Sequence, residues 1–324
     1  MREYEFILQD TIAKAKAVFQ KHQNICISYS GGADSDVVID FIHRYISPVK
    51  SVMFDTGVEF RATLDHVRDM QLKYEIDIIR ASRSVPTSNK KFGHPFLSKY
   101  ISEMLERLQR HNFKFQEHGN LSFDELNSLY PRCKSALRWW CDEWGHGSHF
   151  SIARNKHLKE FLIDNGLPFL VSGKCCDGAK KMPAKKYAKD NGVDLFVLGI
   201  RRSEGGVRST AYSSCYQQHG RGNNNYAQYF PVFFWTNDMM RWYKDAFDVV
   251  HSKAYSVYGL SRTGCAACPF ASGFDNELEV LARYEPKKYK GISAIFASSH
   301  DYRRRYYEYK FSQQNNLIVP DDVV

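Results

Sequence analysis

The segment from residue 25 to residue 46 constrains the fold of this chain most. A β-branched apolar run, Ile25-Cys26-Ile27-Ser28-Tyr29, leads into Ser30-Gly31-Gly32-Ala33-Asp34-Ser35, and a further apolar segment follows at 36–39. This order predicts a strand, a tight loop and a helix. Two glycines let the backbone turn sharply, and the loop N–H groups with the helix N-terminus favour an anion such as phosphate.

The flanking regions alternate between strand and helix patterns. We expect strands over 25–29, 49–54, 76–79 and 195–200, and helices over 5–22, 35–46, 59–74 and 175–190. Such alternation is typical of an α/β fold, a parallel twisted sheet with helices on both faces. Four regions follow: a nucleotide-binding core over 1–82, a helical and aromatic insertion over 83–165, the second part of the core over 166–205, and a C-terminal region over 206–324.

Within these regions the local patterns differ in clarity. The insertion is polar, aromatic-rich and irregular, with a helical pattern near 97–110, and residues 169–171 look strand-like. The C-terminal region is rich in Tyr, Gly, Asn and Ser and becomes helical from about residue 275. This region also contains the two later cysteines, Cys265 and Cys268.

The charge balance favours an anionic partner. Lys and Arg number 45 against 36 Asp and Glu, a net charge of +9, which fits nucleotides or nucleic acid, although a modestly basic surface explains it equally well. No apolar run spans a bilayer, and the N-terminus carries acids where a signal peptide would be basic. We therefore expect a cytoplasmic protein with no membrane partner, whose eight cysteines are thiols or metal ligands.

The glycine loop lacks the Gly-Lys-Ser/Thr ending of a Walker loop. It resembles the PP-loop of the N-type ATP pyrophosphatases, the adenine nucleotide alpha hydrolase-like superfamily. The resemblance implies that the loop binds the nucleotide's phosphates through Ser30, Gly31, Gly32, Asp34 and Ser35, and makes Asp34 a catalytic candidate. A glycine-rich turn before a helix is the alternative interpretation.

A second motif follows the next expected strand. Phe54-Asp55-Thr56-Gly57-Val58-Glu59-Phe60 resembles the Asp-Thr-Gly-x-Glu-Phe signature of the phosphoadenylyl sulfate (PAPS) reductase branch. Ligands of open parallel sheets bind at the carboxyl ends of strands. The resemblance implies that Asp55, Thr56 and Gly57 border the nucleotide, whereas an ordinary strand-to-helix turn would also use these residue types.

Four of the cysteines form a pattern of their own. Cys175-Cys176 is followed much later by Cys265-x-x-Cys268, and four thiolates suit zinc or a [4Fe–4S] cluster. The pattern resembles the cluster-bearing members of the PAPS/APS reductase family, which implies that Cys175, Cys176, Cys265 and Cys268 hold a [4Fe–4S] cluster. It also implies that the C-terminal helical region binds this cluster. Buried thiols and a zinc site are the alternatives.

Basic residues follow the cysteine pair. Lys180-Lys181, the stretch Gly199-Ile200-Arg201-Arg202 and the later Arg208 resemble the family's Gly-x-Arg-Arg region, which binds sulfate or phosphates. The resemblance implies that Lys181, Arg201, Arg202 and Arg208 contact the anion. The planar guanidinium group of arginine suits oxyanions. Each residue alone could equally be a solvated surface charge.

The end of the chain departs from the sulfite-forming reductases, which carry a C-terminal Glu-Cys-Gly-Leu-His segment. No cysteine follows Cys268 here. Candidate substitute nucleophiles are Cys133 and Cys141, in a basic part of the insertion, and Cys215, after Arg208. Incidental thiols are the alternative. The insertion's aromatic residues, Trp139, Trp140 and Trp144 among them, could stack bases or form a core.

A second resemblance is to the enzyme subunit of bacterial DNA phosphorothioation, to tRNA-thiolating enzymes and to phage and prophage proteins, which pair a PP-loop with an iron–sulfur cluster. It implies that ATP adenylates an oxygen for replacement by sulfur. An APS/PAPS reductase using another thiol, and a nucleotide-binding regulatory or partner subunit, remain open. The expected cofactors are the cluster, ATP or adenylyl sulfate, and Mg²⁺; the expected partners are an adenine nucleotide, nucleic acid, a sulfur-donor protein and a second copy in a homodimer.

Overall fold

The computed structural model describes residues 2–81, 83–145, 148, 150–204, 212–219 and 226–316. The chain divides into two compact units. The first unit comprises 1–84, 178–266 and 279–288, and the second comprises 85–177, 267–278 and 289–324. The four regions expected from the sequence stay a prediction.

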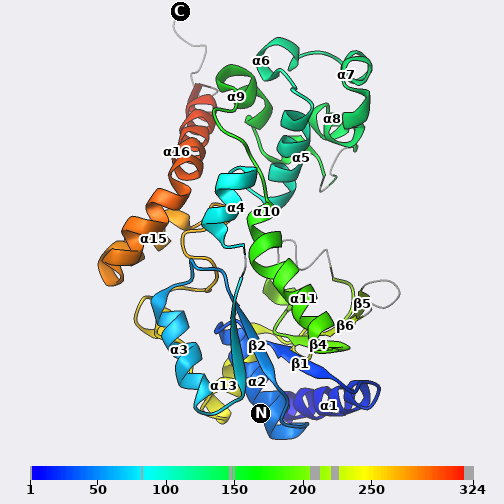
Figure 1. The fold of residues 1–324 in the computed structure, drawn as a ribbon, viewed down its shortest axis with the longest axis vertical. Helices are drawn as coiled ribbons and strands as arrows, with labels where there is room; N and C mark the ends of the chain where they lie inside the picture. Colours follow the sequence, from blue (N-terminus) through cyan, green and yellow to red (C-terminus); the bar gives the residue numbers. More distant parts are fainter. Residues whose placement is uncertain are drawn as a thin grey trace, which may run out of the picture. The chain divides into compact units, whose positions relative to one another are not determined.

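The first unit is built around a six-stranded sheet (Figure 1). Its spatial order is β3-β2-β1-β4-β6-β5, and every pair is parallel except β5 with β6. The strands are β1 (Ile25–Ser28), β2 (Ser51–Asp55), β3 (Ile76–Arg80), β4 (Leu195–Leu198), β5 (Tyr216–His219) and β6 (Tyr226–Tyr229). The expected α/β fold is confirmed, and β5 and β6 are strands that the sequence patterns did not reveal.

Helices cover both faces of this sheet because alternate strand residues point to opposite faces. Ile27 packs into one core with α1, α2 and α13, whereas its neighbour Cys26 packs into another with Tyr187 of α11. The helices of this unit are α1 (Arg2–Phe19), α2 (Ala33–Tyr45), α3 (Arg61–Gln71), α11 (Met182–Asp190), α13 (Asn237–Ala246) and α14 (Lys253–Ser256). The turn η4 (Arg202–Glu204) follows β4.

The second unit is helical around an aromatic core. Its helices are α4 (Val85–Phe92), α5 (Lys99–Arg110), α6 (Phe115–His118), α7 (Phe123–Leu129), α8 (Lys134–Trp140), α9 (Leu158–Asn165) and α10 (Lys174–Cys176), with the turns η1 (Pro131–Cys133) and η2 (Ile152–Arg154). Ser122 and Glu125 cap α7 reciprocally, the Ser-x-x-Glu device that satisfies N-terminal amides. The insertion is thus more regular than its polar sequence suggests, since short capped helices replace the expected irregular chain.

Three further helical segments cross the boundary between the units: η3 (Asp177–Lys181), α15 (Phe274–Tyr284) and α16 (Pro286–Asn316). The strand-like pattern at 169–171 yields only one bridge, from Val171 to His94, because Leu170 between its apolar neighbours is 63% exposed. Among the described residues, no helix is long and apolar enough to cross a membrane.

Candidate functional site in the first unit

The loop after β1 has the geometry of a phosphate-binding turn. Gly31 has a φ of +68°, and a Cβ there would lie 2.8 Å from Val67 Cγ2 and 2.9 Å from Thr63 Cγ2. Only glycine fits this position, because the left-handed backbone and the contact with α3 both exclude a side chain. Helix α2 begins at Ala33, so its N-terminus opens directly onto the loop.

Ser35 ties the loop together. Its Oγ donates to the Gly32 carbonyl at 2.7 Å and accepts from the Gly32 N–H at 3.0 Å. It also lies 3.1 Å from Ser30 Oγ. The side chain of Ser35 is buried, whereas Ser30 is exposed at the open side of the turn. Ser35 therefore shapes the loop, and Ser30 is placed to meet a ligand.

Three neighbouring strands carry the predicted site residues at their carboxyl ends. β1 lies between β2 and β4 and runs parallel to both. The chain moves from β1 to β2 and β3 on one side, and β4 lies on the other, so the order of the strands reverses beside β1. Such a switch point is where open α/β sheets bind ligands. The structure thus brings to one edge the loop 30–35, residues 55–57 and residues 199–202.

Arg201 lies against the start of α2. Its Nε is 3.0 Å from Asp34 Oδ2, and its Nη1 donates to Ser203 Oγ at 2.9 Å and to Asn237 Oδ1 at 2.8 Å. Arg201 is only 9% exposed. Gly199 allows this approach, because a Cβ there would lie 2.8 Å from the Asp34 carbonyl carbon. Two predicted residues, Asp34 and Arg201, are therefore direct partners.

The Asp-Thr-Gly motif forms a closed turn with Glu59. The carboxylate of Glu59 accepts from the Thr56 hydroxyl at 2.7 Å and from the Thr56 N–H at 3.1 Å. Asp55 accepts from the Gly57 N–H at 2.8 Å, and Gly57 has a φ of +84°. Burial raises the pKa of Glu59, although the Thr56 hydrogen bonds and the charge of Lys180 oppose this rise. The turn is therefore rigid and holds a buried acid.

Cys265 reaches this same turn. Its Sγ is 3.5 Å from Thr56 Oγ1, and its backbone pairs with Glu59 in an isolated antiparallel bridge. The Ala266 N–H donates to the Val58 carbonyl at 2.8 Å. The segment that carries one predicted cluster ligand is thus fastened to the second nucleotide motif.

The structure adds loop contacts that the sequence patterns missed. Tyr255 of α14 accepts from the Ala33 N–H at 3.0 Å, and its hydroxyl lies 3.2 Å from Thr263 Oγ1. A Cβ on Gly32 would lie 3.1 Å from Thr263 Oγ1. No motif marks Tyr255, because it meets Ala33 across 222 positions of sequence.

A buried polar group beneath the loop was also missed. Asp36, which is fully buried, accepts from Tyr29, from His66 Nε2 at 2.9 Å and from His251 Nδ1 at 2.9 Å. Burial and the nearby Asp36 carboxylate raise the pKa of Tyr29, so its hydroxyl stays a donor. The first turn of α2 is therefore anchored by three side chains, and the only sequence signal was an acid inside an apolar helix segment.

The other predicted anion contacts lie in two short helical turns and beyond the described residues. Lys181 ends η3 and Arg202 begins η4, and both side chains are exposed. Arg208 lies outside the described residues. Their roles stay predictions.

The predicted cluster ligands lie in both units. Cys265 belongs to the first unit, whereas Cys175, Cys176 and Cys268 belong to the second. Within the part of the chain that the structure describes, no group of three or more His, Cys, Asp and Glu side chains is arranged to hold a metal ion. Four thiols nevertheless match the donor set of a [4Fe–4S] cluster, so the ligand set remains a prediction supported by donor chemistry.

Cys133 and Cys141 lie in the second unit, at the two ends of α8. Burial raises the pKa of both thiols, although Arg107 and Arg110 oppose the rise at Cys133. A raised pKa disfavours the thiolate that a nucleophile needs. Trp139 and Trp140 beside them are fully buried, so these two aromatics form core rather than a stacking surface, whereas Trp144 is 39% exposed.

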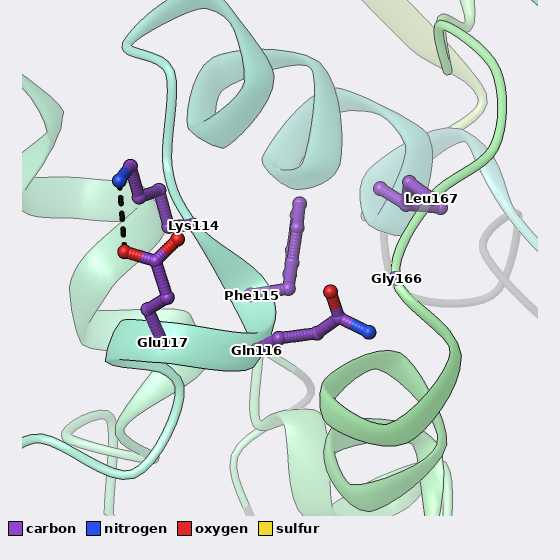
Figure 2. Close-up of a pocket in the computed structure, with 6 residues that line it drawn as sticks. All are labelled: Lys114, Phe115, Gln116, Glu117, Gly166 and Leu167. Atoms are coloured by element: carbon purple, nitrogen blue, oxygen red, sulfur yellow. Dashed lines mark hydrogen bonds and ion pairs between the residues drawn. The ribbon is translucent and has the colours of Figure 1, made fainter.

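A hollow of about 240 Å³ lies elsewhere in the second unit. Figure 2 shows its lining, with Lys114 and Glu117 turned toward one another, 2.8 Å apart. It contains none of the residues predicted from the sequence motifs, and it is lined by Lys114, Phe115, Gln116, Glu117, Gly166 and Leu167.

The sheet order and the glycine turn define an α/β domain with a glycine-containing loop at its switch point. Residues 24–113 match the model of the phosphoadenosine phosphosulfate reductase domain. This segment contains both the loop 30–35 and the Asp55-Thr56-Gly57 motif. Over these residues the chain is similar to the PAPS reductase domain.

Relatives of known sequence or structure are distant. An uncharacterized protein of Methanocaldococcus jannaschii, MJ0973, is 22% identical over 268 residues, which cover 80% of this chain and 46% of the relative. The chain thus spans about half the length of this relative.

Three solved structures are similar. A PAPS reductase of Candida auris in complex with phosphate has 13% identity and a TM-score of 0.44 over 82% of this chain and 95% of its own. The FMN adenylyltransferase of Candida glabrata, with FAD and pyrophosphate, has 12% identity and a TM-score of 0.41 over 82% and 64%. The U34-tRNA thiolase NcsA of Methanococcus maripaludis, with its [4Fe–4S] cluster, has 12% identity and a TM-score of 0.38 over 94% and 80%.

Proposed function

We propose that this chain is an iron–sulfur PP-loop ATP pyrophosphatase that adenylates a substrate, of the nucleic-acid class, for sulfur transfer. The observation that carries the proposal is the meeting of the loop 30–35, residues 55–57 and Arg201 at the carboxyl ends of three adjacent parallel strands. This arrangement supports an adenine nucleotide whose phosphates lie on the loop.

In the proposed complex, Ser30 and the backbone from Gly31 to Gly32 bind the pyrophosphate part of ATP. Arg201 is buried and already held by Asp34, so its fork is oriented before ligand arrives. Such preorganisation lowers the cost of binding an oxyanion. Mg²⁺ would neutralise part of the triphosphate charge, while Lys181, Arg202 and Arg208 are further candidate contacts.

The proposed reaction has two steps. First, a substrate oxygen attacks the α-phosphorus of ATP, the bond to the β-phosphate oxygen breaks, and pyrophosphate leaves. The substrate is then an AMP ester. Second, a sulfur nucleophile supplied by a donor forms the carbon–sulfur or phosphorus–sulfur bond, and AMP leaves with the oxygen. Asp34 is the carboxylate within the loop, and it orients Arg201 throughout.

Cys175, Cys176, Cys265 and Cys268 are the proposed cluster ligands. A bound [4Fe–4S] cluster would supply an electron for handling sulfur. The hydrogen-bond contact of Cys265 with Thr56 supports a thiol held beside the nucleotide motif. A cytoplasmic setting belongs to the proposal, because thiols stay reduced there.

A second candidate is an APS/PAPS reductase, which the family match favours. This reaction needs a thiolate that accepts the sulfonate. Burial raises the pKa of Cys133 and of Cys141, which weighs against either as that nucleophile. We therefore place adenylation first.

The deciding experiment uses protein purified without oxygen. Iron and sulfide are measured, and the same sample is incubated with ATP, APS or PAPS, with and without single-stranded DNA and tRNA. We expect pyrophosphate from ATP in the presence of nucleic acid, with AMP released only when a sulfur donor is added, and Asp34→Asn should reduce pyrophosphate formation.

Other outcomes distinguish the candidates. Sulfite from APS or PAPS would overturn adenylation in favour of the reductase. Tight ATP binding with no cleavage on any substrate would indicate a regulatory or partner subunit. Colourless protein with stoichiometric zinc would refute the cluster.

A further inference from the structure

The loop that carries Cys268 is held by side chains from two helices of the second unit. The loop runs from Ala267 to Ala271, and Ala267 has a φ of +49°. A left-handed backbone is costly for alanine and persists only where neighbouring groups hold it. The described contacts of this loop show what holds it.

Three side chains form hydrogen bonds with backbone groups of this loop. Glu277 of α15 accepts from the Ala267 N–H at 2.7 Å, and His300 of α16 donates from Nε2 to the Ala267 carbonyl at 2.8 Å. Arg303 of α16 donates to the Pro269 carbonyl and, at 2.7 Å, to the Ala271 carbonyl. The residues on both sides of Cys268 are therefore fixed.

The two α16 residues act from one helix face, because positions three apart are neighbours on a helix. The ring of His300 stacks on Phe274 with centroids 4.5 Å apart and an angle of 10°. The guanidinium of Arg303 lies 5.0 Å from the centre of the Phe274 ring. Phe274 therefore packs against both donors, His300 and Arg303, and restricts their movement.

Arg303 is a buried cation. It is 3% exposed, and its remaining donors reach the Tyr307 hydroxyl at 3.0 and 2.6 Å. Among the described residues, no ion pair joins Arg303 to a carboxylate. A buried charge without a counter-ion is unfavourable, so this cation favours an anionic group near the loop.

We propose that Glu277, His300 and Arg303 form a cradle that presents Cys268 in its ligand conformation, and that Arg303 supplies positive charge to the anionic cluster. The cradle rests on the proposed function in naming a cluster as the ligand. These three are positioning residues: they act through the backbone of the Cys268 loop. Outer hydrogen bonds of this kind orient metal ligands and tune the site.

The test compares Arg303→Lys, Arg303→Gln and Tyr307→Phe with Arg305→Lys. Arg303→Lys keeps the charge but cannot span two carbonyls and the tyrosine, and Arg303→Gln removes the charge. Tyr307→Phe is a mild variant that removes one acceptor of Arg303. Arg305 is on the same helix but donates to Asn165, so its variant is the matched control.

Two measurements are made after circular dichroism has verified folding. In metal-free protein, the rate of Cys268 alkylation by iodoacetamide is followed by peptide mass spectrometry. We expect it to rise about 5-fold in both Arg303 variants, less in Tyr307→Phe, and not in the control, because the released loop opens more often. In reconstituted protein, we expect a chelator to remove iron about 10-fold faster. The midpoint potential should fall in Arg303→Gln but not in Arg303→Lys.

Unchanged alkylation in all three variants would overturn the cradle, whether or not iron binds. If Arg303→Lys and Arg303→Gln fail to fold, the Tyr307→Phe alkylation rate decides. Failure of the wild type to bind iron and sulfide would refute the cluster in the proposed function, and the alkylation rates would still decide whether the cradle positions Cys268.

Discussion

In the first unit, the candidate site residues lie in loops at the ends of strands. In the second unit, side chains from helices hold the loop that carries Cys268. In the first unit, Gly31 and Gly199 permit backbone contacts too close for any other residue. In the second, the buried Arg303 and His300 bind loop carbonyls. A parallel sheet aligns its loops through topology, while a helical unit needs a specific side chain for each loop.

This difference predicts which property each unit loses when its residues are substituted. Substitutions at the loop of the first unit should remove ligand binding while the fold persists. Substitutions in the core of the second unit should remove stability. The four predictions below test this contrast.

The largest effect is expected at Trp140 in the second unit. Trp140 is fully buried and donates from Nε1 to the Gly119 carbonyl at 3.0 Å. Trp140→Ala should cost about 3–5 kcal/mol of unfolding free energy, because it leaves a cavity and an unpaired carbonyl. Hydrogen exchange should show lost protection in α5 and α8, with peptides of β1 and β2 retained.

Trp144→Ala is the matched control, since that ring is 39% exposed and should cost under about 0.5 kcal/mol. Equal losses of protection in both units after Trp140→Ala would refute the contrast, because the units would then unfold together.

The next effect is expected at Gly31. Gly31→Ala must adopt a φ of +68° with its Cβ 2.8 Å from Val67 Cγ2. The loop should shift, and the affinity for ATP and pyrophosphate should fall about 100-fold, as calorimetry can measure.

Gly166→Ala is the control from the second unit. Gly166 has a φ of +61°, with nothing within 4 Å of an added Cβ. The Gly166→Ala variant should lose some stability but keep its nucleotide affinity. Wild-type pyrophosphate binding by Gly31→Ala would show that the loop is not the phosphate site.

A smaller effect is expected at Arg201. Arg201→Lys keeps the charge but loses the fork that spans Asp34, Ser203 and Asn237. Nucleotide affinity should fall about 10-fold at constant fold stability, measured by titration and thermal unfolding.

Arg44→Lys provides the comparison. Arg44 makes a two-pronged contact with Asp40 at 2.9 Å farther along α2. Its variant should change stability and leave nucleotide affinity unaltered. The reverse pattern, with Arg44→Lys weakening binding and Arg201→Lys not, would contradict the assignment of the site.

The smallest effect is a pH dependence in the second unit. Burial lowers the pKa of His300 below 6.5, although its hydrogen bond to Ala267 opposes this. The unfolded chain then binds the proton more readily than the folded chain. The stability is therefore complete above pH 6.5 and is lost as the pH falls from 6.5 through the lowered pKa.

Thermal unfolding between pH 7.5 and 5 measures this loss. His300→Gln keeps a donor for Ala267 but does not titrate, so its acid-induced loss of stability should be smaller. An identical pH profile for wild type and His300→Gln would exclude this origin.

Short stretches of sequence predict some parts of the candidate site. The loop 30–35 and the turn 55–57 each follow an apolar strand, and the carboxyl ends of adjacent parallel strands share an edge. The helices of the insertion are harder to predict from the sequence, because Ser122 and Glu125 start a helix inside a polar segment with weak periodicity. Trp139 and Trp140 have the same composition signal whether they stack bases or fill a core, and only burial separated the two.

The sequence alone determined the order of strand, loop and helix around residue 30, because these patterns depend on neighbours in the chain. Only tertiary structure decided which distant groups complete the loops. Tyr255 reaches Ala33 across 222 positions and His251 reaches Asp36 across 215. Arg303 reaches the carbonyls beside Cys268 from another helix. Such contacts satisfy individual buried polar groups, and no local pattern specifies which side chain will do so.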